Sequence, residues 1–222
     1  MSTTAPTTTG PNTTAPNTTV RRLAQRARYD RENVYAILDD AYVAHVGAVV
    51  DGAPVVMPYA CARVGDELVL HGSVKAGILS ALANGARVCA TVTHVDGLVL
   101  ARSAFHSSMN YRSAVVHATA RVITDPDEKV RLLDALVDRL LPGRRAGIRA
   151  MAQGELDATQ VVALALDHVS AKIRTGPPTE PLEDRDAGVW GGVIPLALTH
   201  GTPQADEFTA AGVAPPAAGR PG

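Results

Sequence analysis

The chain of 222 residues carries 21 Lys and Arg against 22 Asp and Glu, a formal net charge of −1 that excludes a domain held to nucleic acid by a basic excess. Hydrophobic residues make up 46%, which excludes disorder throughout, and two cysteines are too few for a disulfide framework or a four-thiolate metal site. No segment reaches the roughly 18 consecutive apolar residues of a membrane-spanning helix, so we expect no membrane partner.

Low-complexity segments mark both ends of the chain. Residues 2–19 hold nine Thr and three Pro and no large apolar side chain, so we predict a disordered arm over residues 1–19. Residues 201–222 are rich in Gly, Pro and Ala and are expected to form a flexible tail. The folded domain is therefore expected over residues 20–200. The N-terminus lacks the basic and apolar segments of a secretory signal, which predicts a cytoplasmic protein.

The first half of the domain is predicted to combine short helices with strands. Asp30 is a helix-capping residue type and precedes an apolar stripe that includes Ile37, so a helix is expected over residues 30–40. Strands are expected over residues 42–50, 54–60 and 66–71, separated by Asp-Gly and Gly-Asp turns. A second helix is expected over residues 74–84, just before Gly85.

The second half is predicted to hold strands around one longer helix. Strands are expected over residues 87–93 and 98–105, joined by a turn at Asp96 and Gly97, and over residues 111–123. Asp125, Pro126 and Glu128 form a strong helix start. The apolar residues expected to face inward from this helix are Val130, Leu133, Leu136, Val137, Leu140 and Leu141. One long final strand is expected over residues 161–174.

The short turns between these strands favour antiparallel pairing. Two-residue turns can join antiparallel neighbours, whereas parallel neighbours need longer crossover connections. Six or seven strands interrupted by single helices predict a mainly β fold with a few helices, in which an antiparallel barrel carries the helices on its outside. A doubly wound parallel sheet is disfavoured.

A first candidate site lies where a predicted strand runs into a predicted helix at His71, Gly72, Ser73 and Lys75. Free backbone N–H groups at a helix start, a hydroxyl and a lysine could hold a phosphate, and Gly72 would let the backbone approach it. The alternative is a capped helix beside a histidine that plays a structural role.

A second candidate site is the polar segment over residues 107–113. Arg112 could bind a phosphate with its forked guanidinium, and Asn110 and the serine hydroxyls could read a planar heterocycle. The alternative is a polar loop that satisfies its own hydrogen bonds. One face of the last predicted strand carries Ser170, Lys172 and Arg174. Such a polar face is usually only solvated, so it counts as part of a binding site only together with the other two segments.

Several motifs resemble one family in the same order along the chain. The strings LHGS, DGLVLARSAFHSSMNYRSAVV, PGR, SAKIRTGPP and VWGGVIPL look like the pyridoxamine 5′-phosphate oxidase-like flavoproteins, most of all the branch of nitroimidazole-resistance (Nim) and flavin-nucleotide-binding proteins. The likeness covers residues 21–196. It implies an FMN-binding split β-barrel and a homodimer with two flavin sites at the subunit interface.

The resemblance also assigns residues to the cofactor. It places His71, Gly72, Ser73 and Lys75 in a turn beside the flavin, and Trp190 over the flavin or substrate face, although a lone tryptophan is more often part of a core. The residues matching the second flavin-contacting motif are Ser108, Asn110, Tyr111, Arg112 and Ser113, and Lys172 is added to the cofactor-binding set. The basic and histidine motifs of members that oxidise vitamin B6 are missing after Arg174, so that reaction is not expected.

These observations lead to an FMN-dependent oxidoreductase acting on a small nitro, quinone-like or heterocyclic substrate. In this hypothesis Lys75 and Arg112 neutralise the FMN phosphate, and His71 is the catalytic residue that orients or protonates the substrate. One alternative is a haem-binding protein on the same barrel with His71 or His117 as axial ligand. Another is a flavin-binding module without catalysis. The spacing of the other histidines indicates no zinc site.

Overall fold

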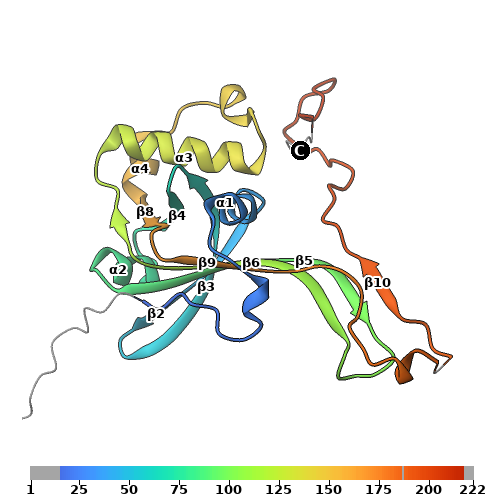
Figure 1. Ribbon diagram of the computed structural model, residues 1–222. Helices are drawn as coiled ribbons and strands as arrows, with labels where there is room; N and C mark the ends of the chain where they lie inside the picture. Colours follow the sequence, from blue (N-terminus) through green and yellow to red (C-terminus); the bar gives the residue numbers. More distant parts are fainter. Residues whose placement is uncertain (1–15, 187, 218–222) are drawn as a thin grey trace, which may run out of the picture.

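The computed structural model describes residues 16–186 and 188–217, which form a mainly β structure with four α-helices (Figure 1). The strands are β1 (Ala27–Arg28), β2 (Val43–Val50), β3 (Ala53–Val64), β4 (Glu67–Ser73), β5 (Arg87–Leu100), β6 (Ser108–Thr119), β7 (Arg121–Val122), β8 (Thr159–Ala165), β9 (Val169–Arg174) and β10 (Gly192–Pro195). The helices are α1 (Arg31–Asp39), α2 (Gly77–Ala83), α3 (Pro126–Leu140) and α4 (Gln153–Ala158). All strand pairings within these ranges are antiparallel, which confirms the predicted fold class.

Two sheets make up the split barrel, and the chain passes directly from one sheet to the other at two places. Sheet A has the order β1-β9-β6-β5-β2-β3, with β10 added beside β5, and sheet B has the order β3-β4-β8-β7. The first part of β3 pairs with β2 and its last four residues pair with β4. Only Ala120 separates β6 in sheet A from β7 in sheet B. The chain itself therefore holds the two sheets together.

The barrel interior is filled from both sheets and closed by two short helices. Asp30 caps α1 as predicted, because its side chain accepts a hydrogen bond from the backbone N–H of Asn33 at 2.9 Å. Val34, Ile37 and Leu38 then point into the core, where they are at most 1% exposed. The second helix, α2, contributes Ile78, Leu79 and Leu82 to the same core.

A second, smaller core lies between α3 and the outer side of sheet B (Figure 1). Helix α3 begins after Asp125, as predicted, and the sequence correctly places Leu133 and Leu136 inside. The prediction for Leu140 is wrong, since it is 58% exposed, and fully buried Leu132 takes part in the core instead. The buried stripe sits further toward the N-terminus because the last turn of α3 extends past the sheet.

The structure corrects three predicted boundaries. Strand β5 continues through Asp96 and Gly97 with a β-bulge, whereas the sequence predicted a hairpin turn there. Residues beyond the bulge, 97–110, together with β10 form an extension of sheet A, here called the arm (Figure 1). The predicted strand over residues 161–174 is two strands, β8 in sheet B and β9 in sheet A. Helix α2 begins only at Gly77.

The predicted limits of the folded domain, residues 20 and 200, stay predictions. Residues 1–15 of the predicted N-terminal arm lie outside the described residues, and residues 201–217 form turns and irregular backbone. Within the described part of the chain, none of the helices combines the length and apolar character needed to cross a membrane.

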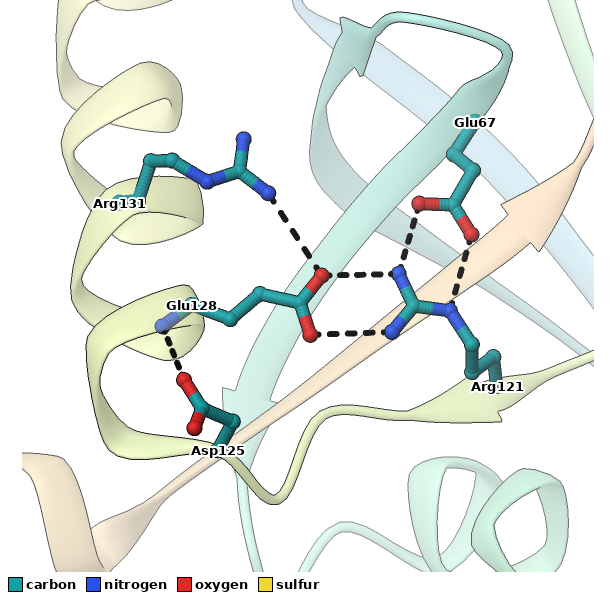
Figure 2. A network of polar contacts seen from close by, with 5 residues as sticks. All are labelled: Glu67, Arg121, Asp125, Glu128 and Arg131. Carbon is teal, nitrogen blue, oxygen red and sulfur yellow. Dashed lines mark hydrogen bonds and ion pairs between the residues drawn. The ribbon is translucent and has the colours of Figure 1, made fainter.

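An arginine on β7 ties the start of α3 to sheet B (Figure 2). Arg121 donates to Glu67 of β4 with its Nη2 at 2.7 Å and to Glu128 of α3 with both terminal nitrogens at 3.0 Å. Asp125 caps the same helix by accepting from the backbone N–H of Glu128 at 2.7 Å. Arg131 adds a longer contact to Glu128. Two carboxylates thus face each other across one guanidinium.

We expect this network to make the stability of the protein sensitive to acid. Hydrogen bonds from Arg121 hold the pKa of Glu128 below its ordinary value, so the stabilisation is complete above the unfolded-state pKa and is lost as pH falls through the lower folded-state pKa. Urea midpoints measured from pH 7 down to pH 3 should therefore fall, and the fall should be shallower in Arg121→Gln, which starts from a lower midpoint. Arg131→Gln serves as control because its longer contact is largely exposed. An unchanged acid slope in Arg121→Gln would contradict this role.

Candidate functional site

One face of sheet A carries hydroxyl, histidine and lysine side chains. The residues that point away from the barrel core, here called the open face, include Val43, His45, Val49, Val56, Thr91, Thr93, Val95, Tyr111, Ser113 and Lys172. Their Cα atoms are paired across neighbouring strands, so successive alternate residues lie side by side on one surface. All of them are exposed or half-buried, whereas the residues between them in β2 and in the barrel part of β5 are mostly buried.

Three residues predicted to bind the cofactor lie together on the open face. Ser113 is paired with Lys172 across β6 and β9, and Tyr111 lies two residues further along β6. Ser113 donates to the backbone carbonyl of Lys172 at 3.4 Å, and Lys172 Nζ donates to the carbonyl of Arg22 at 3.1 Å. The sequence alternation had placed Tyr111 and Ser113 on one side of a strand, and the structure confirms this.

His71 lies on the same side of the barrel wall as the open face. His71 is paired with Val161 of β8, which belongs to the side of sheet B that α3 covers. The same side of β3 continues into sheet A, where Ala60 pairs with Val43 of the open face. The imidazole is half-buried and forms no hydrogen bond or ion pair with the described residues. Burial lowers the pKa of His71, so the ring is neutral at pH 7 with a free lone pair. It suits a metal ligand or hydrogen-bonding group better than an acid.

The predicted phosphate cradle at the start of a helix is not formed. His71, Gly72 and Ser73 belong to β4 and pair with β8, and α2 begins four residues later without a side-chain cap. Ser73 Oγ accepts from the backbone N–H of Lys75 at 3.2 Å, and the Lys75 side chain is exposed. The backbone N–H groups expected to face a ligand are therefore used in a sheet ladder.

Arg112 points into the protein and is already paired with two carboxylates. Its Nη1 lies 2.7 Å from Asp40 at the end of α1, and its Nη2 lies 3.0 Å from Asp96 in the bulge of β5. Hydrogen bonds to Asp96 and Asp40 raise the pKa of Arg112. A guanidinium held by two carboxylates is a poor partner for phosphate, so the expected charge neutralisation by Arg112 has no support in this arrangement.

Two predicted residues lie on the arm, and one is buried at its base. Ser108 pairs with Val99, and Trp190, 62% exposed, precedes β10, which also pairs with the outer part of β5 (Figure 1). Asn110 is 8% exposed and accepts a hydrogen bond from Arg174. The structure therefore separates Ser108 and Trp190 from His71, which lies on β4 in the other sheet.

A cavity of about 520 Å³ opens beside the open face. It lies between residues 40–43 after α1, His45 and Thr93 of the open face, and residues 196–198 after β10. Arg112 is the only residue of the predicted site in its wall. His94 also lines it, and its Nε2 must carry the proton because it lies 2.9 Å from the carbonyl oxygen of Ile37. Sequence spacing gave no signal for His45 or His94, because their neighbours come from distant parts of the chain.

Relatives of known structure share this arrangement of strands. A structure described as the FAD and haem binding protein from Mycobacterium smegmatis is 45% identical, with a TM-score of 0.83, and covers 87% of this chain and 95% of its own. The flavocytochrome Anf3 from Azotobacter vinelandii is 38% identical, with the same TM-score of 0.83, over 89% and 92% of the two chains.

A more distant structure shows the fold alone. A candidate 5-nitroimidazole antibiotic resistance protein from Bacteroides thetaiotaomicron is 22% identical, with a TM-score of 0.57 over 66% of this chain and 86% of its own. No curated protein matches the sequence.

The family model described as pyridoxamine 5′-phosphate oxidase matches residues 30–173, which is more than half of the chain. This range runs from the cap of α1 to β9 and contains the open face as well as His71. The resemblance carried by the sequence motifs is thereby confirmed. The chain belongs to the pyridoxamine 5′-phosphate oxidase family.

Proposed function

We propose that the protein is a flavin-dependent oxidoreductase whose flavin lies on the open face of sheet A. The observation that carries the proposal is the joining of Tyr111, Ser113 and Lys172, three residues from two sequence motifs, on one uncovered surface. Hydroxyls and an ammonium group suit the carbonyl and N–H edges of a flavin and its negative charge. A bound flavin supplies the transfer of electrons or hydride, and the protein supplies position and electrostatics.

The flavin we propose is the dinucleotide FAD. The sequence motifs led to FMN, but the 45% identical relative is described as a FAD and haem binding protein. The substrate would be a small nitro, quinone-like or heterocyclic compound. The half-apolar cavity beside His45 and Thr93 supports this class, since it borders the open face and is large enough for such a ring.

A second candidate function, haem binding, is favoured by His71. A neutral, half-buried imidazole with no partner among the described residues has a ring nitrogen lone pair available to haem iron. The names of the two relatives described above at 45% and 38% identity, a FAD and haem binding protein and a flavocytochrome, agree with this role. His117 of β6, the other ligand that the sequence suggested, also points away from the barrel core.

We also propose that two copies of the chain cover the open face. Its valines Val43, Val49, Val56 and Val95 are each at least 43% exposed, and so large an apolar surface is typical of an interface. A homodimer with the cofactor between its subunits would bury these side chains. One chain has a mass of 23.1 kDa, so light scattering during size-exclusion chromatography should then give about twice that mass.

The first test is the absorption spectrum of the protein purified without added cofactor, with identification of what acid releases. We expect the two bands of a flavin and FAD in the supernatant, and a Soret band if haem is present as well. His71→Ala should remove the Soret band, because the iron loses its ligand, and should lower turnover of any substrate.

Matched controls separate these effects from general damage. His168→Ala changes an exposed histidine in the turn between β8 and β9 and should leave both sets of bands in place. Ser113→Ala should weaken flavin binding without removing the Soret band. A colourless protein that takes up neither FAD nor FMN would refute the proposed function, and a Soret band that survives in His71→Ala would exclude His71 as the ligand.

A further inference from the structure

Four cations gather where β1 meets β9, and no carboxylate in the described part of the chain is paired with them. Arg22 and Arg26 precede or border β1, and Lys172 and Arg174 lie on β9, with Ala27 paired to Lys172. We call these four residues the basic edge. Among the described residues none of the four forms an ion pair. This cluster stands out in a chain whose formal net charge is only −1.

Arginines elsewhere in the described chain are mostly neutralised. Those in ion pairs are Arg31, Arg63, Arg102, Arg112, Arg121, Arg131, Arg145 and Arg149. Residues 1–19, which precede the basic edge in the sequence, contain no Asp or Glu that could supply a counter-charge. The positive charge of the edge is therefore left for a group outside the protein.

Arg174 makes this excess charge unusual, because it is buried. The residue is only 7% exposed, and its Nε has no hydrogen-bond partner within residues 16–186 and 188–217. Nη1 and Nη2 donate to Asn110 and to the carbonyls of Gly176 and Pro177, at 3.2 Å for each carbonyl, so neutral oxygens hold the guanidinium in place. Burial and the nearby charge of Arg26 lower the pKa of Arg174. A buried cation without a counter-ion is costly and marks a site for an anion.

The basic edge adjoins the open face. Lys172 belongs to both, and it pairs with Ser113, while Arg174 pairs with Tyr111. A ligand whose ring system lies over Tyr111 and Ser113 would therefore reach the edge with a substituent. The other two cations that the sequence assigned to phosphate do not compete for it. Lys75 is exposed in the turn after β4, and Arg112 is held by Asp40 and Asp96.

We propose that the basic edge binds the diphosphate of the flavin dinucleotide. This rests on the proposed function and adds to it the part of the cofactor that distinguishes FAD from FMN and riboflavin. Two adjacent phosphate groups carry two negative charges, which match a cluster of guanidinium and ammonium groups. The same phosphate ester chemistry occurs in a nicotinamide dinucleotide that could act as electron donor, so the test includes both.

The test is a titration of the full-length protein, freed of bound flavin, with riboflavin, FMN, FAD and NADPH, followed by flavin fluorescence or calorimetry. Arg22→Gln and Arg26→Gln should each raise the Kd of FAD about tenfold, since each removes a charge-assisted contact, and should leave riboflavin unchanged. Added salt should weaken FAD binding more in the wild type than in the double variant. Arg144→Gln removes an exposed arginine elsewhere and is the control. At the buried position 174 the variant is Arg174→Lys, because it keeps the positive charge and so preserves folding.

The outcomes separate this proposal from the proposed function. Weaker FAD binding with unchanged riboflavin binding supports the basic edge. If riboflavin, FMN and FAD bind alike in the wild type and in the variants, flavin binding stands and the basic edge is refuted. Weakening confined to NADPH also refutes it and assigns the edge to the electron donor. If no flavin binds at all, both proposals fail together.

Discussion

Replacement of Leu132 by alanine is expected to lower the free energy of unfolding by about 2–5 kcal/mol. Leu132 is fully buried in the cluster that α3 forms with Val69 and Val161 of sheet B. The substitution removes most of a buried side chain and leaves a cavity between a helix and a sheet that are fixed at several other points. Urea unfolding followed by circular dichroism gives the change directly.

Leu140 provides the matched comparison. It lies on the same helix but is 58% exposed, so Leu140→Ala should cost less than about 1 kcal/mol. The pair of variants tests whether the contact of α3 with sheet B ends before the last turn of the helix, because Leu140 lies four residues after buried Leu136 on the same side of α3. Equal losses from the two substitutions would show that the last turn is covered as well.

The second large effect is expected from Gly72→Ala, with a loss of about 1–3 kcal/mol. A Cβ at position 72 would lie 2.7 Å from Cδ1 of Leu79 and 3.4 Å from Cε1 of Tyr59. Leu79 is fully buried in the barrel core, so α2 cannot make room without moving away from β4. The loss should appear in the unfolding midpoint of the protein with and without flavin.

Gly77→Ala controls for the general effect of replacing a glycine in this region. Nothing lies within 4 Å of a Cβ at position 77, and alanine favours the helix that begins there, so stability should stay equal or rise slightly. If Gly72→Ala weakens only flavin binding and leaves the unfolding midpoint unchanged, position 72 serves the cofactor, as the sequence motif suggested, and its role in packing is refuted.

Local patterns in the sequence were sufficient for most of the fold. Caps at Asp30 and Asp125 and the alternation in β5 and β6 each act over a few residues, so they could be recognised without knowledge of the neighbours. The failures occurred where pairing overrides local preference. Asp96 and Gly97 are turn residues by type, but partners on β6 keep the chain extended, and β8 and β9 separate although no Gly or Pro lies between them.

The candidate site was less predictable because its charges are balanced by distant residues. The sequence alone predicts that Arg112 is free to bind phosphate. The structure shows that Asp40, 72 positions away in the sequence, is hydrogen-bonded to it. In contrast, Arg174 was given weight only beside the two other polar segments of the sequence, and its burial without a carboxylate could not be known from the sequence. Tyr111, Ser113 and Lys172 were grouped by motif, and only the strand register shows that they share a surface.

The bulge at Asp96 limits how the arm can change in evolution or in design. Because side chains alternate along a strand, the extra residue reverses which side the following positions face, and Leu98 and Leu100 depend on it. Deleting Asp96 alone would turn both leucines to the opposite side and disturb the pairing with β10. The arm can be lengthened or shortened in steps of two residues per strand, whereas single insertions or deletions would exchange its two surfaces.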